Sequence, residues 1–126
     1  MTLDCSHLML IKLTKNFSMK HSERDKFIES QFSKMMEITR SKGVEYANSE
    51  LDANANFKEI GAKMGIDPKV VLWIYATKHF QSITSFVKKC KVESNEPIEG
   101  RVHDLALYSL LLLSLIEDEN NEKSPF

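Results

Sequence analysis

The sequence predicts an all-α protein, folded as a compact helical bundle of about four helices. Apolar residues recur at spacings of three and four along three long segments, which is the period of one helix face. Residues that typically begin or end helices stand at the boundaries of these segments. The chain has 126 residues, of which 42% are hydrophobic and 28% charged, so its size and composition are those of one globular domain.

Residues 22–42 predict the first helix. Ser22 is a candidate N-cap, and the acidic side chains of Glu23 and Asp25 suit the positive end of the helix dipole. Gly43 is a suitable left-handed stop at the other end. The apolar stripe of this helix consists of Phe27, Ile28, Phe32, Met35, Met36 and Ile38.

Two further helices are predicted in the middle of the chain. A brief helix that starts near Phe57 is closed by Gly65, and a polar, Asn-rich loop or short helix precedes it. The pair Asp67 and Pro68 then begins a long helix, because Asp caps exposed amides and Pro has no amide to lose. Helical spacing of apolar residues continues from there to about Lys91.

Residues 99–116 form the last predicted helix, and its run of four leucines is apolar on every side. Such a helix is packed all round, so we expect a homo-oligomer in which a second copy covers part of it. The acidic tail, residues 118–126, is expected to be flexible. Residues 1–18 fit neither a strong helix nor a signal peptide. Because Met19 follows them, they are interpreted as a possible N-terminal extension of a helical domain spanning 19–117.

The charge balance and the apolar segments exclude two classes of partner. Lys and Arg number 17 against 18 Asp and Glu, so no bulk positive field holds polymeric nucleic acid or an anionic membrane surface. The longest apolar stretch, residues 105–116, is shorter than the roughly 20 residues that a bilayer core requires. Cys5 and Cys90 lie far apart without metal-ligand spacing, and they are interpreted as reduced thiols of a cytoplasmic protein.

The last predicted helix carries three polar residues on one stripe. Arg101, Asp104 and Tyr108 are spaced three and four apart, so they share a face of an otherwise apolar element. Charged groups near a leucine-rich core are costly unless they are paired. Either these residues bond one another as structural links, or they line a polar pocket that holds a ligand.

The long helix before it carries a second polar stripe at the same spacing, formed by Tyr75, Lys78, His79 and Ser82. Lys78 suits a phosphate group, and Tyr75 suits the stacking of a base. The alternative interpretation is a solvent-facing stripe with an amphipathic Tyr at its edge.

Two asparagines near the start of the brief helix form a third feature. Asn54 and Asn56 lie where free backbone amides are available to an anion, and their side chains could bind a base edge or a sugar hydroxyl. They could equally cap the helix that follows.

Metal and covalent catalysis find little support. A divalent ion in a helical bundle usually takes three or four inward carboxylates from repeated pairs, and that pattern is not visible here. Glu96 and Glu99 flank Pro97 and suit the dipole of the last helix instead. No Ser/His/Asp or Cys/His arrangement and no glycine-rich phosphate loop is recognisable. We therefore expect no metal and no cofactor.

Three short motifs carry a family resemblance. They are Lys42-Gly43-x-Glu45-Tyr46, Lys78-His79-x-x-Ser82, and the run Asn95-Glu96-Pro97-Ile98-Glu99-Gly100-Arg101-Val102-x-Asp104-Leu105-x-x-Tyr108. Together they resemble the nucleotide modification associated domain family (type 1), small helical proteins frequent in phage genomes, over roughly residues 27–117. In that family, an acidic turn precedes an Asp and a Tyr on the final apolar helix, and a basic motif lies on the helix before it. Ser82 stands at a position where the family often has Arg. The resemblance implies that the functional residues of this chain include Lys78, His79, Glu96, Asp104 and Tyr108.

One function and two alternatives follow. The resemblance favours a phage-type protein that captures a nucleotide or a nucleotide-derived immune signal, without turning it over, in the host cytoplasm. The last helix is also similar to that of all-alpha NTP pyrophosphatases, which implies a magnesium-dependent pyrophosphatase or a base-modification enzyme as an alternative. Their ExxE pair is not visible at the corresponding place. The third hypothesis is a protein inhibitor of a host defence complex that uses its apolar helix surface.

Overall fold

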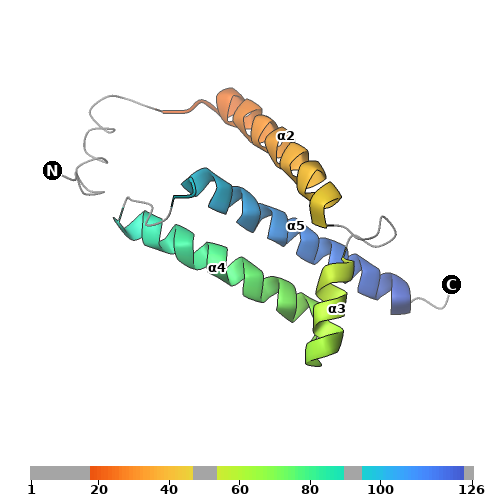
Figure 1. The fold of residues 1–126 in the computed structure, drawn as a ribbon. Coiled ribbons are helices and arrows are strands. Elements are labelled where there is room, and N and C mark those ends of the chain that lie inside the picture. The colour runs from red at the N-terminus through yellow and green to blue at the C-terminus, as the bar shows by residue number, and fades with distance from the viewer. Residues whose placement is uncertain (1–17, 47–53, 90–94, 124–126) are drawn as a thin grey trace.

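The computed structural model describes residues 18–46, 54–89 and 95–123, and all regular structure in these ranges is helical. The four helices described are α2 (His21–Tyr46), α3 (Ala55–Met64), α4 (Pro68–Lys89) and α5 (Ile98–Lys123), as Figure 1 shows. The predicted all-α class is therefore confirmed. The expectations for residues 1–17, Cys5 and Cys90 lie outside the described residues.

The long helices α4 and α5 form the central pair of the fold. They run side by side in opposite directions, and most contacts between helices belong to this pair (Figure 1). The short helix α3 crosses near the start of α4 and packs mainly on it. Helix α2 lies along the other side of α5 and makes few contacts with it. The fold is thus a tight three-helix unit with one loosely attached helix.

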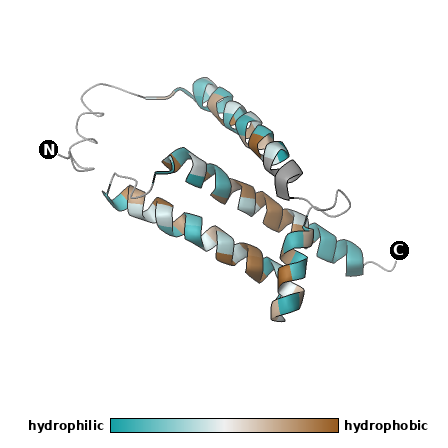
Figure 2. Cartoon of the chain, viewed as in Figure 1, coloured by the Kyte–Doolittle hydropathy of each residue, from teal (hydrophilic) through white to brown (hydrophobic). Residues whose placement is uncertain are grey.

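The buried core lies where α3, α4 and α5 meet. Phe57, Val71, Leu72 and Leu115 form one cluster of buried side chains, and Leu72 is fully buried. Figure 2 shows apolar residues on the part of α4 nearest α3 and along the middle of α5. Each such side chain stabilises the fold by about 1.5–3 kcal/mol relative to an exposed position. Partly buried side chains from α3 and α5 extend the cluster, namely Ile60, Tyr108, Leu111 and Leu112.

The turn between α3 and α4 depends on two glycines and on Asp67. Gly65 has a φ of 68° and ends α3 in the left-handed conformation, which glycine adopts without steric cost. At Gly61 a Cβ atom would lie 2.6 Å from the carbonyl oxygen of Ile66, so only glycine allows this close approach. The Asp67 carboxylate accepts a hydrogen bond of 2.8 Å from the Lys69 amide and caps α4. The predicted stop at Gly65 and start at Asp67 are confirmed.

The ends of α2 differ from the prediction. The helix begins at His21, so Ser22 lies inside it, and the Lys20 amide instead donates to the Glu23 carboxylate at 2.9 Å. Helix α2 also passes through Gly43 and ends at Tyr46, so the predicted stop at Gly43 is wrong. A glycine does not by itself end a helix, because its cost in a helix interior is only about 1 kcal/mol.

Helix α5 continues to Lys123, past the expected end at Ile116 and into the acidic segment expected to be flexible. Three ion pairs explain this extension. Glu119 pairs with Lys123 one turn later at 3.0 Å, and Asp118 and Glu119 reach lysines of α3 and α4. Residues 118–123 are therefore part of the folded unit.

Much apolar surface stays exposed. Met35 of α2 is buried, whereas Phe27 and Phe32 on the same helix are each 50% exposed. The leucine run of α5 is not packed all round in the single chain, since Leu113 is 63% exposed. Within the described residues, every helix is too short or too polar to cross a membrane.

Candidate functional site

The two predicted polar stripes meet between α4 and α5. The rings of Tyr75 and Tyr108 are stacked, with centroids 6.4 Å apart and planes 10° apart. The His79 ring lies 5.3 Å from Tyr108, and Phe57 of α3 contacts Tyr75 edge-on at 6.3 Å. The polar residues predicted separately on two helices therefore form one row of aromatic rings.

His79 and Asp104 face each other across the helix pair. Their nearest atoms, His79 Nδ1 and Asp104 Oδ2, are 3.8 Å apart, beyond the length of a hydrogen bond. The His79 Nδ1 atom is buried and has no hydrogen-bond partner. A buried polar atom without a partner costs about 1–3 kcal/mol, so a second group that bonded this nitrogen would stabilise the site.

Tyr108 lies at the centre of the row. Burial raises the pKa of its phenol above the ordinary value of 10.0, and the nearby Asp104 carboxylate and Tyr75 raise it further. The phenol is consequently neutral at physiological pH and its O–H remains a hydrogen-bond donor.

Arg101 continues the row toward the start of α5. Its guanidinium pairs with the Glu96 carboxylate at 2.8 Å, and so links the residues before α5 to the first turn of the helix. The Arg101 side chain is 23% exposed, and its Nε atom is buried without a hydrogen-bond partner. Arg101 thus pairs with Glu96, while Asp104 faces His79, an arrangement that the stripe alone did not specify.

The remaining residues of the α4 stripe lie at its edge. Lys78 is exposed to solvent, one position before His79, and Ser82 is half-buried one turn further along α4. Lys78 is therefore placed to meet a group that approaches from solvent, beside the aromatic rings.

Asn54 is not brought into this row. Its side chain is buried, and its amide donates to Ser114 Oγ at 3.0 Å and to Asp118 Oδ2 at 3.1 Å. It makes no capping hydrogen bond to α3, so it joins the start of α3 to the second half of α5. Asn56 is exposed on the first turn of α3. The structure thus gives Asn54 a structural role that neither interpretation of the sequence had named.

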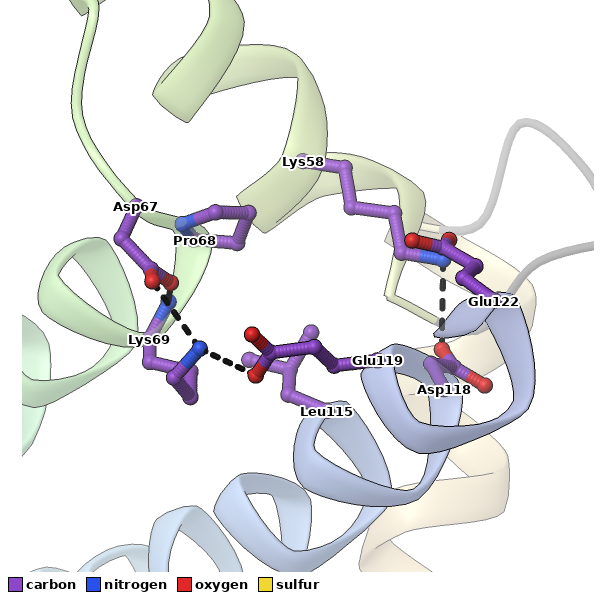
Figure 3. Close-up of a pocket in the computed structure, with 8 residues that line it drawn as sticks. All are labelled: Lys58, Asp67, Pro68, Lys69, Leu115, Asp118, Glu119 and Glu122. Atoms are coloured by element: carbon purple, nitrogen blue, oxygen red, sulfur yellow. Dashed lines mark hydrogen bonds and ion pairs between the residues drawn. The ribbon is translucent and has the colours of Figure 1, made fainter. Parts of the chain in front are cut away.

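A second cluster of charges surrounds the start of α4 (Figure 3). Lys69 Nζ lies 2.9 Å from Asp67 and 2.6 Å from Glu119, and Lys58 Nζ lies 3.2 Å from Asp118. These residues, together with Pro68, Leu115 and Glu122, line an open pocket of about 190 Å³. We call this set the α4 clamp.

The α4 clamp is a structural device. Hydrogen bonds from Lys69 lower the pKa of the Asp67 and Glu119 carboxyls, and hydrogen bonds from Asn54 and Lys58 lower that of Asp118. Its lysines are engaged by carboxylates of the same cluster, and its volume is below the roughly 300 Å³ at which ligand pockets begin. Sequence reasoning missed these ion pairs because their partners on α5 lie in the segment expected to be flexible.

Metal binding by the described residues lacks a suitable donor set. Across residues 18–46, 54–89 and 95–123, no three His, Cys, Asp or Glu side chains come together where they could hold an ion.

No family model, curated protein or solved structure that was compared with the chain matches it. The row between α4 and α5 therefore has to be interpreted from its own chemistry. That chemistry combines flat aromatic rings, cationic groups at the edge and buried polar atoms that lack partners.

Proposed function

We propose that the protein binds a nucleotide or a nucleotide-derived signal at the row between α4 and α5 and holds it without chemical change. The observation that carries the proposal is that two buried atoms without hydrogen-bond partners, His79 Nδ1 and Arg101 Nε, lie on the two helices that carry the stacked aromatic rings. Native proteins pair nearly all buried polar atoms, and exceptions deserve a functional explanation. We call residues Tyr75, Lys78, His79, Arg101, Asp104 and Tyr108 the nucleotide row.

The chemistry of the row suits the two halves of a nucleotide. Tyr75 is 37% exposed and can stack a base against its ring, as aromatic side chains do in single-strand binding sites. Lys78 on α4 and Arg101 on α5 are the cations of the row, and phosphate groups take charge-assisted hydrogen bonds from such side chains. Phosphate binding at Arg101 would replace its surface pair with Glu96, which is a small loss because the Glu96 side chain is 68% exposed.

Asp104 and Tyr108 supply polar recognition of the base or sugar. The neutral Tyr108 phenol donates a hydrogen bond, and the Asp104 carboxylate accepts one from a sugar hydroxyl or a base N–H. A nucleotide that donated to His79 Nδ1 would pair an atom that now has no partner.

The small number of carboxylates at the row favours binding without chemical change over metal-dependent catalysis. Asp104 is the carboxylate of the row and Glu96 pairs with Arg101 beside it, whereas divalent-metal sites in helical bundles collect three or four carboxylates that project inward. In the cell, we propose that a phage-type protein of this kind removes a host immune messenger from solution by binding it.

The proposal is tested by a thermal-shift and mass-spectrometric screen against nucleotides, dinucleotides and cyclic oligonucleotides, with and without magnesium. A ligand at 100 times its Kd stabilises the folded state by about 2.7 kcal/mol, which is readily seen as a higher Tm. We expect a stabilising ligand that is recovered intact from the denatured protein. Chemical conversion of the ligand, abolished by Asp104→Asn, would establish an enzyme instead, and the lack of any shift would refute nucleotide binding.

Single substitutions test whether the ligand binds at the nucleotide row. Tyr75→Ala and Arg101→Met should each weaken binding at least tenfold, because they remove the stacking surface and a phosphate partner. Asn56→Ala is the matched control, since Asn56 is an exposed residue on α3 outside the row. Equal losses in all three variants would contradict this site.

A further inference from the structure

The face of α4 that points away from α5 carries a regular apolar seam. Opposite this face, Val71, Leu72 and Ala76 are buried. Along the seam, residues follow one another at alternating steps of three and four, the heptad spacing by which helices pack as coiled coils. Its members are Val70, Trp73, Thr77, Phe80, Thr84 and Val87, and the four nonpolar ones are 49%, 51%, 60% and 65% exposed in that order.

The two threonines of the seam present no unmet polar group. Thr77 Oγ1 donates to the Trp73 carbonyl oxygen and Thr84 Oγ1 donates to the Phe80 carbonyl oxygen, both at 2.8 Å. Each hydroxyl is therefore satisfied within its own helix and loses no hydrogen bond when the surface is covered. The seam behaves as continuously apolar over about five turns of α4.

The order of residues makes the seam complementary to itself. A two-fold axis midway between Thr77 and Phe80, perpendicular to the helix, exchanges the two ends of α4 in a second copy. Val70 then meets the partner's Val87, Trp73 meets the partner's Thr84, and Phe80 meets the partner's Thr77. Each large ring thus faces a small side chain, which lets the two surfaces interdigitate without overlap.

Charge favours the same antiparallel arrangement. Helix α4 contains no acidic residue, and it ends in Lys88 and Lys89. At its start, the lining of the α4 clamp has four carboxylates and two lysines, so the acids outnumber the bases even when the neighbouring Lys123 is added (Figure 3). An antiparallel partner brings the basic end of one α4 beside the acidic end of the other, whereas a parallel partner would align lysines with lysines.

The exposed area is of the size that a dimer requires. The four nonpolar seam residues and the adjacent Ile74, which is 54% exposed, together expose roughly 600 Å², given that a fully exposed aromatic residue offers about 150–250 Å². A stable interface buries about 800 Å² per partner, and the threonine methyls and lysine stems beside the seam supply much of the remainder.

We propose that the occupant of this face is a second copy of the chain, docked antiparallel through the α4 seam. The inference is independent of what the nucleotide row binds. It differs from the expectation that the last helix forms the contact, because the α4 seam combines heptad spacing, internally satisfied hydroxyls and a self-complementary order.

Sedimentation velocity of the full chain over a range of concentrations tests the proposal. We expect a dimer, of twice 14.5 kDa, and a shift to monomer in Phe80→Glu, whose two buried charges should raise the dimer Kd by at least about 100-fold. Phe32→Glu is the matched control, because Phe32 is a half-exposed aromatic residue of α2. Far-ultraviolet circular dichroism must show unchanged helix content in both variants. A monomeric wild type, or an assembly that Phe80→Glu leaves unaltered, would overturn the proposal.

Disulfide trapping tests the orientation. In a Cys5→Ser, Cys90→Ser background, Val70→Cys mixed with Val87→Cys should cross-link rapidly, because the antiparallel seam places these positions opposite each other. Val70→Cys alone should not, since the two copies would stand about 26 Å apart at a rise of 1.5 Å per residue. Rapid cross-linking of Val70→Cys with itself and not with Val87→Cys would show a parallel pair and contradict the inference.

Discussion

The α4 clamp and the nucleotide row lie on the same helix pair but treat their polar groups in opposite ways. In the clamp, Lys58 and Lys69 pair with carboxylates on α5 at 3.2 and 2.6 Å, and the neighbouring Asn54 donates to Asp118 at 3.1 Å. In the row, two buried nitrogens have no hydrogen-bond partner, and His79 Nδ1 lies 3.8 Å from Asp104 Oδ2. The paired groups of the clamp stabilise the fold, whereas we propose that the two unpaired nitrogens of the row serve the binding of a ligand.

The largest effect on stability is expected at the hydrophobic centre of the clamped end. Leu72→Ala removes a fully buried side chain and should lower the free energy of unfolding by about 2–5 kcal/mol. Leu113→Ala is the matched control, because Leu113 is 63% exposed, and it should change stability by less than about 0.5 kcal/mol. Urea unfolding followed by circular dichroism measures both, and equal losses would contradict the assigned core.

A smaller loss is expected at the α3–α4 turn. Gly61→Ala places a Cβ atom 2.6 Å from a backbone oxygen and should destabilise the protein by about 1–3 kcal/mol. Gly100→Ala meets no atom within 4 Å and, as an alanine in a helix, should be neutral or stabilising by up to about 1 kcal/mol. If urea midpoints moved in the same direction for both variants, the tight approach at Gly61 would not be the cause.

The clamp also predicts acid sensitivity. The pKa values of Asp67, Asp118 and Glu119 are lowered in the folded state by their hydrogen bonds to Lys69, Asn54 and Lys58. Their contribution is therefore complete above the ordinary values, 3.8 for Asp and 4.5 for Glu, and is lost as the pH falls through the lowered values. Urea midpoints should decrease between pH 5 and pH 3, and Lys69→Met should flatten that decrease. An unaltered pH profile in Lys69→Met would assign the acid sensitivity to other groups.

The smallest effect on stability should come from the row. Arg101→Met removes a buried Nε without a partner and one surface ion pair, so stability should change by less than about 1 kcal/mol in either direction. Nucleotide affinity should nevertheless fall at least tenfold. A large loss of stability in this variant would show that Arg101 stabilises the fold. The nucleotide row and the α4 clamp would then not differ in their contribution to stability.

The sequence anticipated features that depend on local chemistry. Gly65 as a helix stop and Asp67 with Pro68 as a helix start were predictable because capping involves neighbouring backbone groups. Spacing also placed Tyr75 and His79 on one face of α4, and Asp104 and Tyr108 on one face of α5. Spacing within each helix could not show that these faces meet, which the ring contacts between α4 and α5 establish.

Features that depend on distant partners escaped prediction. Residues 118–123 look like a flexible acidic tail because their stabilising lysines, Lys58 and Lys69, lie 50–60 residues earlier in the chain. Asn54 looked like a capping or ligand-binding residue for the same reason, since its partner Ser114 is 60 residues away. A sequence pattern within one helix contains no information on such pairs.

The proposal that the nucleotide row, and not the α4 clamp, binds the ligand is tested most directly by a nuclear magnetic resonance titration. The labelled protein is titrated with a nucleotide that stabilises it in the thermal-shift screen. We expect chemical-shift changes centred on the rings of Tyr75, His79 and Tyr108. The chemical shift of the Asn54 side-chain amide, beside the α4 clamp, should stay unchanged. Changes centred on Asn54, Lys58 and Lys69, with the rings of the row unaffected, would contradict it.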